Sequence, residues 1–451
     1  MAFPTVYPTG TTLYKGGKAW NGYTIFTNIQ GAILIDMNGN VVKQWKGIGG
    51  ASHPNYILPG GYLMGTTGYR SGPGHQDNMD VVQVDWDGKI VWQFNRYDEV
   101  KDPGKAATWM ARMHHDYQRE GSPVGYYTPG MSPLVDQGNT MILSHKNLQN
   151  PTITDKLLVD DVMVEVTWDG KIVWEWRFSE HVDELGFSEE AKQTLYREPG
   201  WNALRGSADW LHVNSMSTLG PNKWYNGGDQ RFHPDNLIWS GREANIIGIT
   251  DKQSGKIVWQ VGPDYTAPPA LQALGQIIGQ HHPHMIPQGL PGAGNILVFD
   301  DGGTAGYGAQ GKAWRDYSRV IEFDAVTLKL VWEYSPATVG YQTPQHGYRF
   351  YSGFFGSAQR LPNGNTFITE SVDGRLFEVT PDREIVWEYM SPFFETPVAS
   401  PRVSPRELQG VKPTPQIYRA YRVPYEWVPQ LQKPVEQAVT PPDNAQFRVS
   451  P

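Results

Sequence analysis

The histidines are the residues of this sequence best suited to catalysis or metal binding. The sequence has 12 histidines, and four of them open a short segment in the same way, with a His, any residue and then a polar residue. The four triplets are His53-Pro54-Asn55, His114-His115-Asp116, His212-Val213-Asn214 and His282-Pro283-His284. A ring of imidazoles suits metal ligation, acid–base catalysis near neutral pH, or covalent catalysis through a ring nitrogen. Residue type leaves these three open, beside the plainer alternative that each His caps a turn or bonds a neighbouring strand.

The other histidines fall at different places in this pattern. His281 directly precedes His282, and His346 lies shortly before Gly356-Ser357-Ala358, which stands in place of the triplet in a fifth segment. We expect the histidines outside the pattern to be surface or structural residues, namely His75, His145, His181 and His233.

Arg242, in the segment IWSGREANII, is a candidate for binding an anion. A guanidinium on a strand facing a channel is costly to bury unpaired. It therefore pairs with Glu243 or an aspartate, or it binds an anion. Its planar fork fits the oxygens of sulfate, phosphate or a carboxylate.

Several other kinds of site are disfavoured by the sequence. Asp300 and Asp301 are followed by two glycines, which favours a turn over a general-base pair or a metal site. The chain has no cysteine, which excludes disulfides, thiolate ligands and a cysteine nucleophile. The serines and lysines form no GxSxG or SxxK pattern, and no glycine-rich phosphate loop opens a helix.

The elements that would position these residues come from a pattern that occurs six times. Each copy has a short apolar strand, a turn with Asp, Asn or Gly, and a second strand ending near a tryptophan, as in DVVQVDWDGKIVWQF from Asp80. The closing tryptophans are Trp45, Trp92, Trp174, Trp259, Trp332 and Trp387. Each interval between them is long enough for one four-stranded blade, with this hairpin outermost and the histidine triplets opening the inner strands.

The repeat predicts an all-β fold, a six-bladed β-propeller formed by residues 1–451 as one domain. We expect an N-terminal hairpin at about 20–46 to be closed by a C-terminal strand at about 416–424, followed by an extended Pro-rich tail over 425–451. Insertions are expected at about 95–112, 180–210, 221–233 and 261–280, with a helix from Glu189 to Arg197. Innermost strands line the channel, and side chains two apart share a face, so the histidines should converge near the axis.

Composition supports this fold and limits the partners. The 49 Gly and 35 Pro indicate many turns, and 17 Trp and 23 Tyr supply an aromatic core. The net charge of -8 argues against a basic surface that would bind nucleic acid or an anionic membrane. A small molecule is therefore the expected partner. Residues 1–22 lack the features of a signal peptide and no run of 18 apolar residues occurs. We expect a soluble protein, periplasmic if a signal was trimmed and otherwise cytoplasmic, and the oligomeric state stays open.

Motifs along the chain resemble the bacterial arylsulfate sulfotransferases, which are six-bladed propellers that do not use PAPS. The motifs are HHD at His114, DWLHVNS at Asp209, IWSGRE at Ile238, QHH at Gln280, VFDDG at Val298 and AYRVPYEWVP at Ala420. The resemblance implies that a histidine takes a sulfuryl group from an aryl sulfate and passes it to a phenol. The nucleophile then falls on His282 or His281, with further histidines at His212 and at His114 or His115. Arg242 would hold the sulfate oxygens, and Asn214 would bond the sulfate or orient a histidine.

Two alternatives to a cofactor-free sulfuryl transfer remain at this point. The first is a metal-dependent propeller enzyme, a hydrolase, lyase or oxidase acting on an aromatic small molecule with a Zn, Cu, Fe or Ni ion. Its candidate ligands are His53, His114, His212, His282 and His284. The second is a propeller that binds without catalysis. In the sulfotransferase interpretation the substrate-binding candidates are Asn214, Glu243, His284, His53 and His346.

Overall fold

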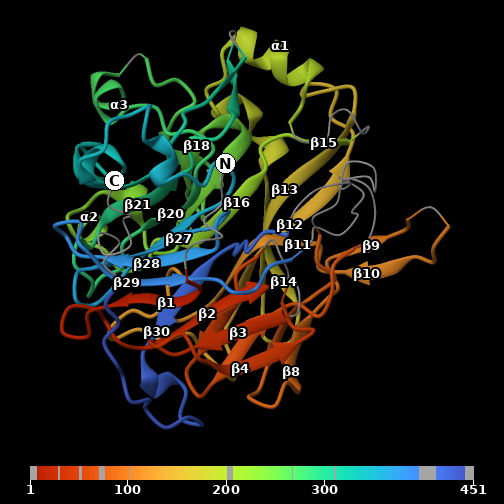
Figure 1. Cartoon of the computed structure of the whole chain (residues 1–451). Helices are drawn as coiled ribbons and strands as arrows, with labels where there is room; N and C mark the ends of the chain where they lie inside the picture. Colours follow the sequence, from red (N-terminus) through yellow and green to blue (C-terminus); the bar gives the residue numbers. More distant parts are fainter. Residues whose placement is uncertain are drawn as a thin grey trace.

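A computed structural model describes residues 8–28, 31–49, 53–70, 77–102, 104–200, 207–266, 268–308, 311–395 and 413–441. Over these residues, six antiparallel sheets of four main strands form the predicted six-bladed β-propeller (Figure 1). Most of the inner and middle strands are fully buried because each blade packs against neighbours on both faces. Middle strands such as β18 and β21 are accordingly rich in apolar residues, whereas inner strands such as β11 and β20 bury polar side chains and histidines.

Within each blade the first-named strand is the innermost, next to the channel, and the last-named is the outermost. The first blade has β30 (Ala420–Val423), β2 (Tyr23–Asn28), β3 (Gly31–Ile35) and β4 (Val41–Lys46), and the second has β5 (Tyr56–Leu58), β6 (Tyr62–Gly65), β7 (Val81–Val84) and β8 (Ile90–Phe94). The third has β11 (Met113–Arg119), β12 (Thr140–Leu148), β13 (Leu157–Val166) and β14 (Ile172–Arg177), with β15 (Ser207–Asp209) parallel to β13. The fourth has β16 (Val213–Thr218), β17 (Leu237–Gly241), β18 (Ile246–Thr250) and β19 (Ile257–Val261).

The last two blades complete the ring. The fifth has β20 (His281–Met285), β21 (Asn295–Asp300), β24 (Arg319–Asp324) and β25 (Leu330–Tyr334). The sixth has β26 (Ser357–Arg360), β27 (Thr366–Glu370), β28 (Arg375–Val379) and β29 (Ile385–Met390), with β1 (Gly10–Tyr14) added outside β29.

The two ends of the described chain meet in the first blade. The C-terminal β30 pairs antiparallel with the N-terminal β2, with Tyr23 opposite Val423 and Phe26 opposite Ala420. In Figure 1 the blue C-terminal segment therefore lies among the red N-terminal strands. This pairing gives the first blade its innermost strand and covers the inner edge of β2.

The closing tryptophans form a belt around the rim of the propeller. Each lies in the outermost of the four main strands and donates its indole N–H to a backbone carbonyl in the outer turn of the following blade. The six bonds run from Trp45 to Asp85 (3.3 Å), Trp92 to Trp168 (2.8 Å), Trp174 to Lys252 (3.1 Å), Trp259 to Ala325 (2.8 Å), Trp332 to Pro381 (2.8 Å) and Trp387 to Met37 (2.8 Å). The last bond joins the sixth blade to the first.

Insertions between blades and between the strands of single blades carry the helices and small hairpins. The predicted helix is α1 (Glu189–Arg197), which begins at a Ser188 side chain that accepts from the Ala191 N–H. The other helices are α2 (Lys223–Asn226), α3 (Pro269–Leu274) and the short 3-10 segments η1 (Phe178–Glu180), η2 (Val182–Glu184), η4 (Gln230–Phe232), η5 (Arg242–Ala244), η6 (Ala337–Val339), η7 (Gly347–Arg349) and η8 (Tyr425–Trp427). The small hairpins are β9 (Asp98–Val100) with β10 (Thr108–Met110), which projects from the body in Figure 1, and β22 (Ala305–Gly308) with β23 (Gly311–Ala313). Among the described residues no helix is long and apolar enough to cross a membrane.

Candidate active site

Three histidines hold a left-handed backbone at the start of inner strands. His115 has φ 56°, His212 has φ 51° and His282 has φ 53°, in the third, fourth and fifth blades. Each of those strands has an irregular pairing at this place. A positive φ is uncommon outside glycine, and such strain clusters at functional sites. The sequence pattern aligned His114 with His212 and His282, but the backbone equivalent is His115, because the left-handed residue of β11 comes one position later in its triplet.

These histidines gather around the C-terminal segment that enters the first blade. The ring centroids of His115 and His212 are 4.6 Å apart. The Tyr418 ring lies 6.0 Å from His115 and 6.4 Å from His281, and Tyr421 lies 5.7 Å from His282. We call His115, His212, His281 and His282 the central cluster. Each of its members is at most 5% exposed.

Hydrogen bonds define which ring nitrogen of each histidine carries the proton. His282 Nδ1 lies 3.1 Å from the Ala358 carbonyl, and His212 Nδ1 lies 2.7 Å from Asp209 Oδ2. Both partners are acceptors, so the Nδ1 atoms are protonated and the Nε2 atoms of neutral rings carry the lone pairs. The Nε2 atom of His282 lies 3.2 Å from the Tyr421 hydroxyl.

His281 has the same tautomer and a carboxylate behind it. Its Nδ1 lies 3.2 Å from the Gly279 carbonyl and 2.9 Å from Asp301 Oδ2. The Gly279 carbonyl accepts a hydrogen bond from Nδ1, so the lone pair of His281 is on Nε2. Asp301 Oδ2 lies within ion-pair distance of Nδ1 without a hydrogen bond, and burial raises the pKa of the Asp301 carboxyl group well above its usual value. The sequence pattern favoured a turn at Asp301; the structure places its side chain against a central histidine.

Burial keeps three members of the central cluster, His115, His281 and His282, neutral. Burial and the charges of Arg242 and Arg419 lower the pKa of His281 well below its usual 6.5. Burial and Arg419 do the same for His282, and burial with the neighbouring His212 does so for His115. These imidazoles are therefore uncharged at neutral pH, which is the form that acts as a nucleophile or ligand.

Arg242 lies beside this cluster and is partly neutralised. It is 3% exposed, lies at the start of η5 and forms an ion pair with Glu243, which also binds Lys312 Nζ at 2.7 Å. Burial opposes ionisation of Glu243, but Arg242 and Lys312 hold its pKa below the usual value. The Arg242 Nε atom is buried and has no hydrogen-bond partner among the described residues, and its guanidinium lies 5.0 Å from the Phe354 ring centroid. Pairing with Glu243 thus leaves part of the guanidinium unsatisfied.

A second arginine, Arg419, joins the first blade to the third and fourth blades. Its side chain is 0% exposed and donates to Asp116 Oδ2 at 2.9 Å and to the Asn214 carbonyl at 2.8 Å. It also donates to the Tyr421 hydroxyl at 3.3 Å. The residue was not predicted as part of the site, although it directly precedes the AYRVP motif that pointed to the C-terminal strand.

A further histidine pair lies on the outer side of His115. The rings of His114 and His145 stack with centroids 3.6 Å apart, and Asp161 faces both. His145 Nδ1 bonds Asp77 Oδ1 at 2.6 Å. Burial would lower the pKa of His145, but Asp77 and Asp161 raise it to about 9. His145 lies outside the triplet pattern because it comes from the second strand of the blade, so no sequence signal brought it to this group.

The remaining candidates are spread around the ring. His284 Nε2 bonds the Tyr126 hydroxyl at 3.0 Å, and burial lowers its pKa to about 3. His53 bonds the Pro54 carbonyl at 3.1 Å, and burial lowers its pKa to about 4. His346 lies on a loop near the rings of Tyr341 and Tyr348, away from these contacts. His75 lies outside the described residues.

Asn214 connects neighbouring blades. Its Nδ2 donates to the Gln280 carbonyl at 2.8 Å, and its Oδ1 is buried without a hydrogen-bond partner in the described part of the chain. The side chain therefore retains one acceptor for a ligand.

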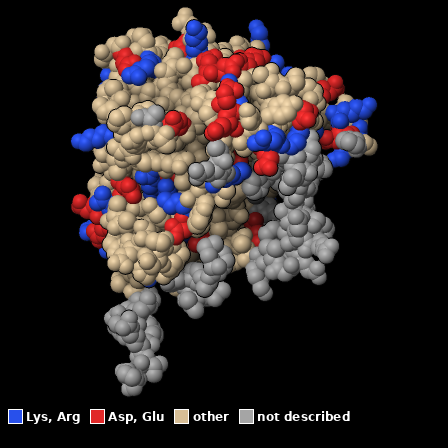
Figure 2. Space-filling view, turned by 90° about the horizontal axis from the view of Figure 1, so that it is seen from above, with Lys and Arg blue, Asp and Glu red and all other residues tan. Residues whose placement is uncertain are grey.

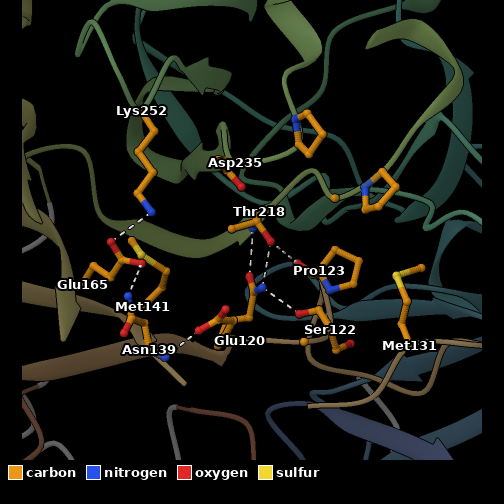
Figure 3. Close-up of a pocket in the computed structure, with 15 residues that line it drawn as sticks. Glu120, Ser122, Pro123, Met131, Asn139, Met141, Glu165, Thr218, Asp235 and Lys252 are labelled. Atoms are coloured by element: carbon orange, nitrogen blue, oxygen red, sulfur yellow. Dashed lines mark hydrogen bonds and ion pairs between the residues drawn. The ribbon is translucent and has the colours of Figure 1, made fainter. Parts of the chain in front are cut away.

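The surface offers a separate pocket on the other side of the blades. A hollow of about 550 Å³ is lined by residues that include Gln118, Glu165 and Lys252, with Lys252 reaching Glu165 at 2.9 Å (Figure 3). It includes Thr218, the last residue of β16, about 20 Å along that strand from His212. The pocket thus lies at the opposite end of β16 from His212. On the face in Figure 2, acidic and basic side chains are interspersed among uncharged ones.

Comparisons with known proteins place these observations in context. The sequence model of the family described as Arylsulfotransferase (ASST) matches residues 132–390, more than half of the chain. No curated protein sequence matches. Among solved structures, the chain is similar to a protein of unknown function from Bacteroides caccae, with 10% identity, 82% of this chain and 94% of that chain covered, and a TM-score of 0.42. A streptogramin B lyase is 13% identical, with 87% of this chain and 86% of that chain covered and a TM-score of 0.37. Virginiamycin B lyase from Staphylococcus aureus with quinupristin is 12% identical, with 85% of this chain and 88% of that chain covered and a TM-score of 0.36.

Proposed function

Because the chain belongs to the arylsulfotransferase family, we propose that it moves a sulfuryl group from an aryl sulfate to a phenolic acceptor through a covalent sulfohistidine. The family match supports an enzyme of the sulfotransferase kind. The observation on which the mechanism rests is a neutral, buried imidazole, His281, with its lone pair on Nε2 beside a partly unsatisfied arginine.

His281 is the preferred nucleophile of the two adjacent histidines. After burial, the charge that most lowers the pKa of His281 is that of Arg242. For His282 it is the charge of Arg419. His281 is thus the imidazole nearer in effect to the arginine assigned to the sulfate. In addition, Asp301 lies behind His281, while His282 Nε2 already contacts the Tyr421 hydroxyl.

Arg242 binds the sulfate oxygens in this proposal. Its unpartnered Nε atom supplies a donor, and its ion pair with Glu243 fixes the guanidinium in place. Lys312 offsets the charge of Glu243, so the acid beside the arginine does not leave the site negative. Donors held in advance stabilise the charge on the transferring sulfuryl oxygens, as in an oxyanion hole. Asn214 is a further candidate to orient the sulfate.

The transfer is balanced over two half-reactions. In the first, His281 Nε2 forms an N–S bond, the S–O bond to the aryl group breaks, and the aryl oxygen leaves as a phenolate with the electron pair of that bond. In the second, the acceptor phenol oxygen attacks sulfur, the N–S bond breaks and its electron pair returns to Nε2, and the phenol proton goes to the lone pair on His212 Nε2. That proton then passes through solvent to the released phenolate, which returns His212 to its starting form. Asp209 on His212 Nδ1 holds that ring in place.

The surroundings suit an aromatic substrate. Phe355 lies 6.0 Å from the His281 ring, and Tyr418 lies 6.4 Å from it. Phe354 lies over the guanidinium of Arg242. Aryl groups of donor and acceptor would pack against such rings with offset or edge contacts.

The test is a burst assay with nitrophenyl sulfate, with and without added phenol. Without acceptor, the wild type is expected to release about one equivalent of nitrophenol per chain and stop, since each His281 is sulfated once. Phenol then restores turnover. His281→Ala should abolish the burst, whereas His282→Ala should keep it at a reduced rate.

Matched variants separate the alternatives. Loss of the burst in His282→Ala with retention in His281→Ala would move the nucleophile to His282. Wild-type protein that neither releases nitrophenol nor acquires the mass of a sulfuryl group would refute the proposed function.

A further inference from the structure

A second buried group of polar side chains lies next to the proposed transfer site and takes no part in it. We define the Asp161 site as His114, His145 and Asp161, from three adjacent strands of the third blade, β11, β12 and β13. All three are at most 2% exposed. One ligand atom of each lies within 4.8 Å of the other two.

Three polar atoms converge there without hydrogen bonds. His114 Nε2, His145 Nε2 and Asp161 Oδ1 are buried, and none has a hydrogen-bond partner among the described residues. Buried polar atoms are nearly always paired, so three unpaired atoms within 4.8 Å of one another call for a bound cation. Around them the other atoms are used, since Asp161 Oδ2 accepts from the Val213 N–H at 3.1 Å.

Two of the three separations between these atoms match metal ligation. Asp161 Oδ1 lies 3.3 Å from His114 Nε2 and 3.5 Å from His145 Nε2. Ligands placed at Zn–N and Zn–O distances of about 2.0–2.1 Å around a tetrahedral ion are about 3.3–3.4 Å apart. We propose that a divalent transition metal ion, Zn²⁺ in the first instance, is bound by His114 Nε2, His145 Nε2 and Asp161 Oδ1.

A carboxylate, Asp77, holds the ligand His145 in place, as is usual for histidine ligands of metal ions. Asp77 Oδ1 bonds His145 Nδ1 at 2.6 Å, which fixes the proton on Nδ1 and leaves Nε2 for the ion. Asp77 Oδ2 is itself held by Arg112 Nε at 2.8 Å and Arg70 Nη1 at 3.0 Å. The second histidine is held by His115, whose Nδ1 lies 2.9 Å from His114 Nδ1.

The contact with His115 links the ion to the transfer site, a consequence that rests on the proposed function. With the ion on His114 Nε2, the His114 proton stays on Nδ1 and is donated to His115 Nδ1. His115 then carries its proton on Nε2. It would offer a donor to the transferring group, whereas His212, His281 and His282 offer lone pairs.

The first experiment measures metal content. Untagged wild-type protein is analysed by mass spectrometry for transition metals, as purified and after unfolding in chelator and refolding with or without Zn²⁺. About one equivalent of Zn²⁺ per chain is expected in the native and zinc-refolded protein. Replacing a ligand in His145→Gln or Asp161→Asn, or the supporting carboxylate in Asp77→Asn, should weaken zinc binding by about tenfold or more.

Controls keep the result separate from folding and from the proposed function. His284→Gln removes another buried histidine and should retain the metal, and His281→Gln should lose sulfuryl transfer while keeping it. If the ligand variants do not fold, the visible spectrum of Co²⁺-refolded wild type must show tetrahedral coordination without sulfur. Zinc-refolded wild type without metal, or loss of metal in His284→Gln to the same extent as in His145→Gln, overturns the inference. A zinc-loaded wild type without transfer refutes the proposed function alone.

Discussion

Replacing Asp116 by Asn should destabilise the propeller more than any change at its surface. The Asp116 carboxylate accepts four hydrogen bonds from four strands or segments. Oδ2 takes Arg419 Nη1 at 2.9 Å and the Met216 N–H at 3.3 Å, and Oδ1 takes the Tyr56 hydroxyl at 2.9 Å and the Tyr117 N–H at 3.0 Å. These partners belong to the first, second, third and fourth blades.

The magnitude follows from what Asn can replace. Its amide oxygen can keep the two bonds made by Oδ1, but its NH₂ group then faces two donors, Arg419 and the Met216 N–H. Arg419 is 0% exposed and would be left as a buried charge without its carboxylate. Breaking one partner of such a buried pair costs about 3–5 kcal/mol. A loss of that size is a large fraction of the usual stability of a folded protein.

The assay is urea unfolding of Asp116→Asn followed by tryptophan fluorescence. The control is Asp229→Asn, which breaks the exposed pair with Arg231 and should cost less than about 1 kcal/mol. In the double variant Asp116→Asn with Arg419→Met, the losses should be far from additive, because the second change removes the stranded charge. An Asp116→Asn protein as stable as Asp229→Asn would show that this ion pair does not hold the blades together.

Two further predictions concern acid stability and close packing. The pKa of His53 is lowered by burial from 6.5 to about 4, so the unfolded chain takes up a proton below pH 6.5 that the folded chain refuses. This part of the stability is present above pH 6.5 and is lost as pH falls towards 4, by up to about 3 kcal/mol. The urea midpoint of His53→Gln should therefore fall less between pH 7 and 4.5 than the midpoint of wild type or of the surface variant His233→Gln. An equal fall of the midpoint in all three proteins would contradict this prediction. A Cβ on Gly303 would lie 1.6 Å from the Gly353 carbonyl oxygen, so Gly303→Ala should lower the thermal midpoint strongly, whereas Gly17→Ala, with open space around it, should not, and an unchanged midpoint for Gly303→Ala would rule out the close approach.

The blade pattern was predictable because it depends on local features. Turn residues, alternating strands and a closing tryptophan recur at each blade, and all six tryptophans lie in the strands expected for them. The helix from Glu189 to Arg197 was likewise predictable from its own residues, with Ser188 before it and two glutamates in its first turn. Family membership followed from motifs that keep their order along the chain.

The composition of the site was less predictable because it depends on register and on loops. A one-residue shift at the start of β11 makes His115, rather than His114, the equivalent of His212. His145 joins His114 through pairing between strands, with His145 opposite Asp161, and Asp77 arrives from the segment before β7. Arg419 arrives from the far end of the sequence. None of these contacts leaves a periodic signal in the sequence.

The tryptophan hydrogen bonds link the six blades into a closed ring. Each bond restrains two adjacent blades at their outer edge, and the bond from Trp387 to Met37 closes the ring, so no pair of neighbouring blades is left without one. The diameter of the central channel is therefore restrained from the outer edge of the propeller. A change of that diameter would strain all six bonds together, so the spacing of the histidines around the axis depends on the whole ring and not only on the strands that carry them.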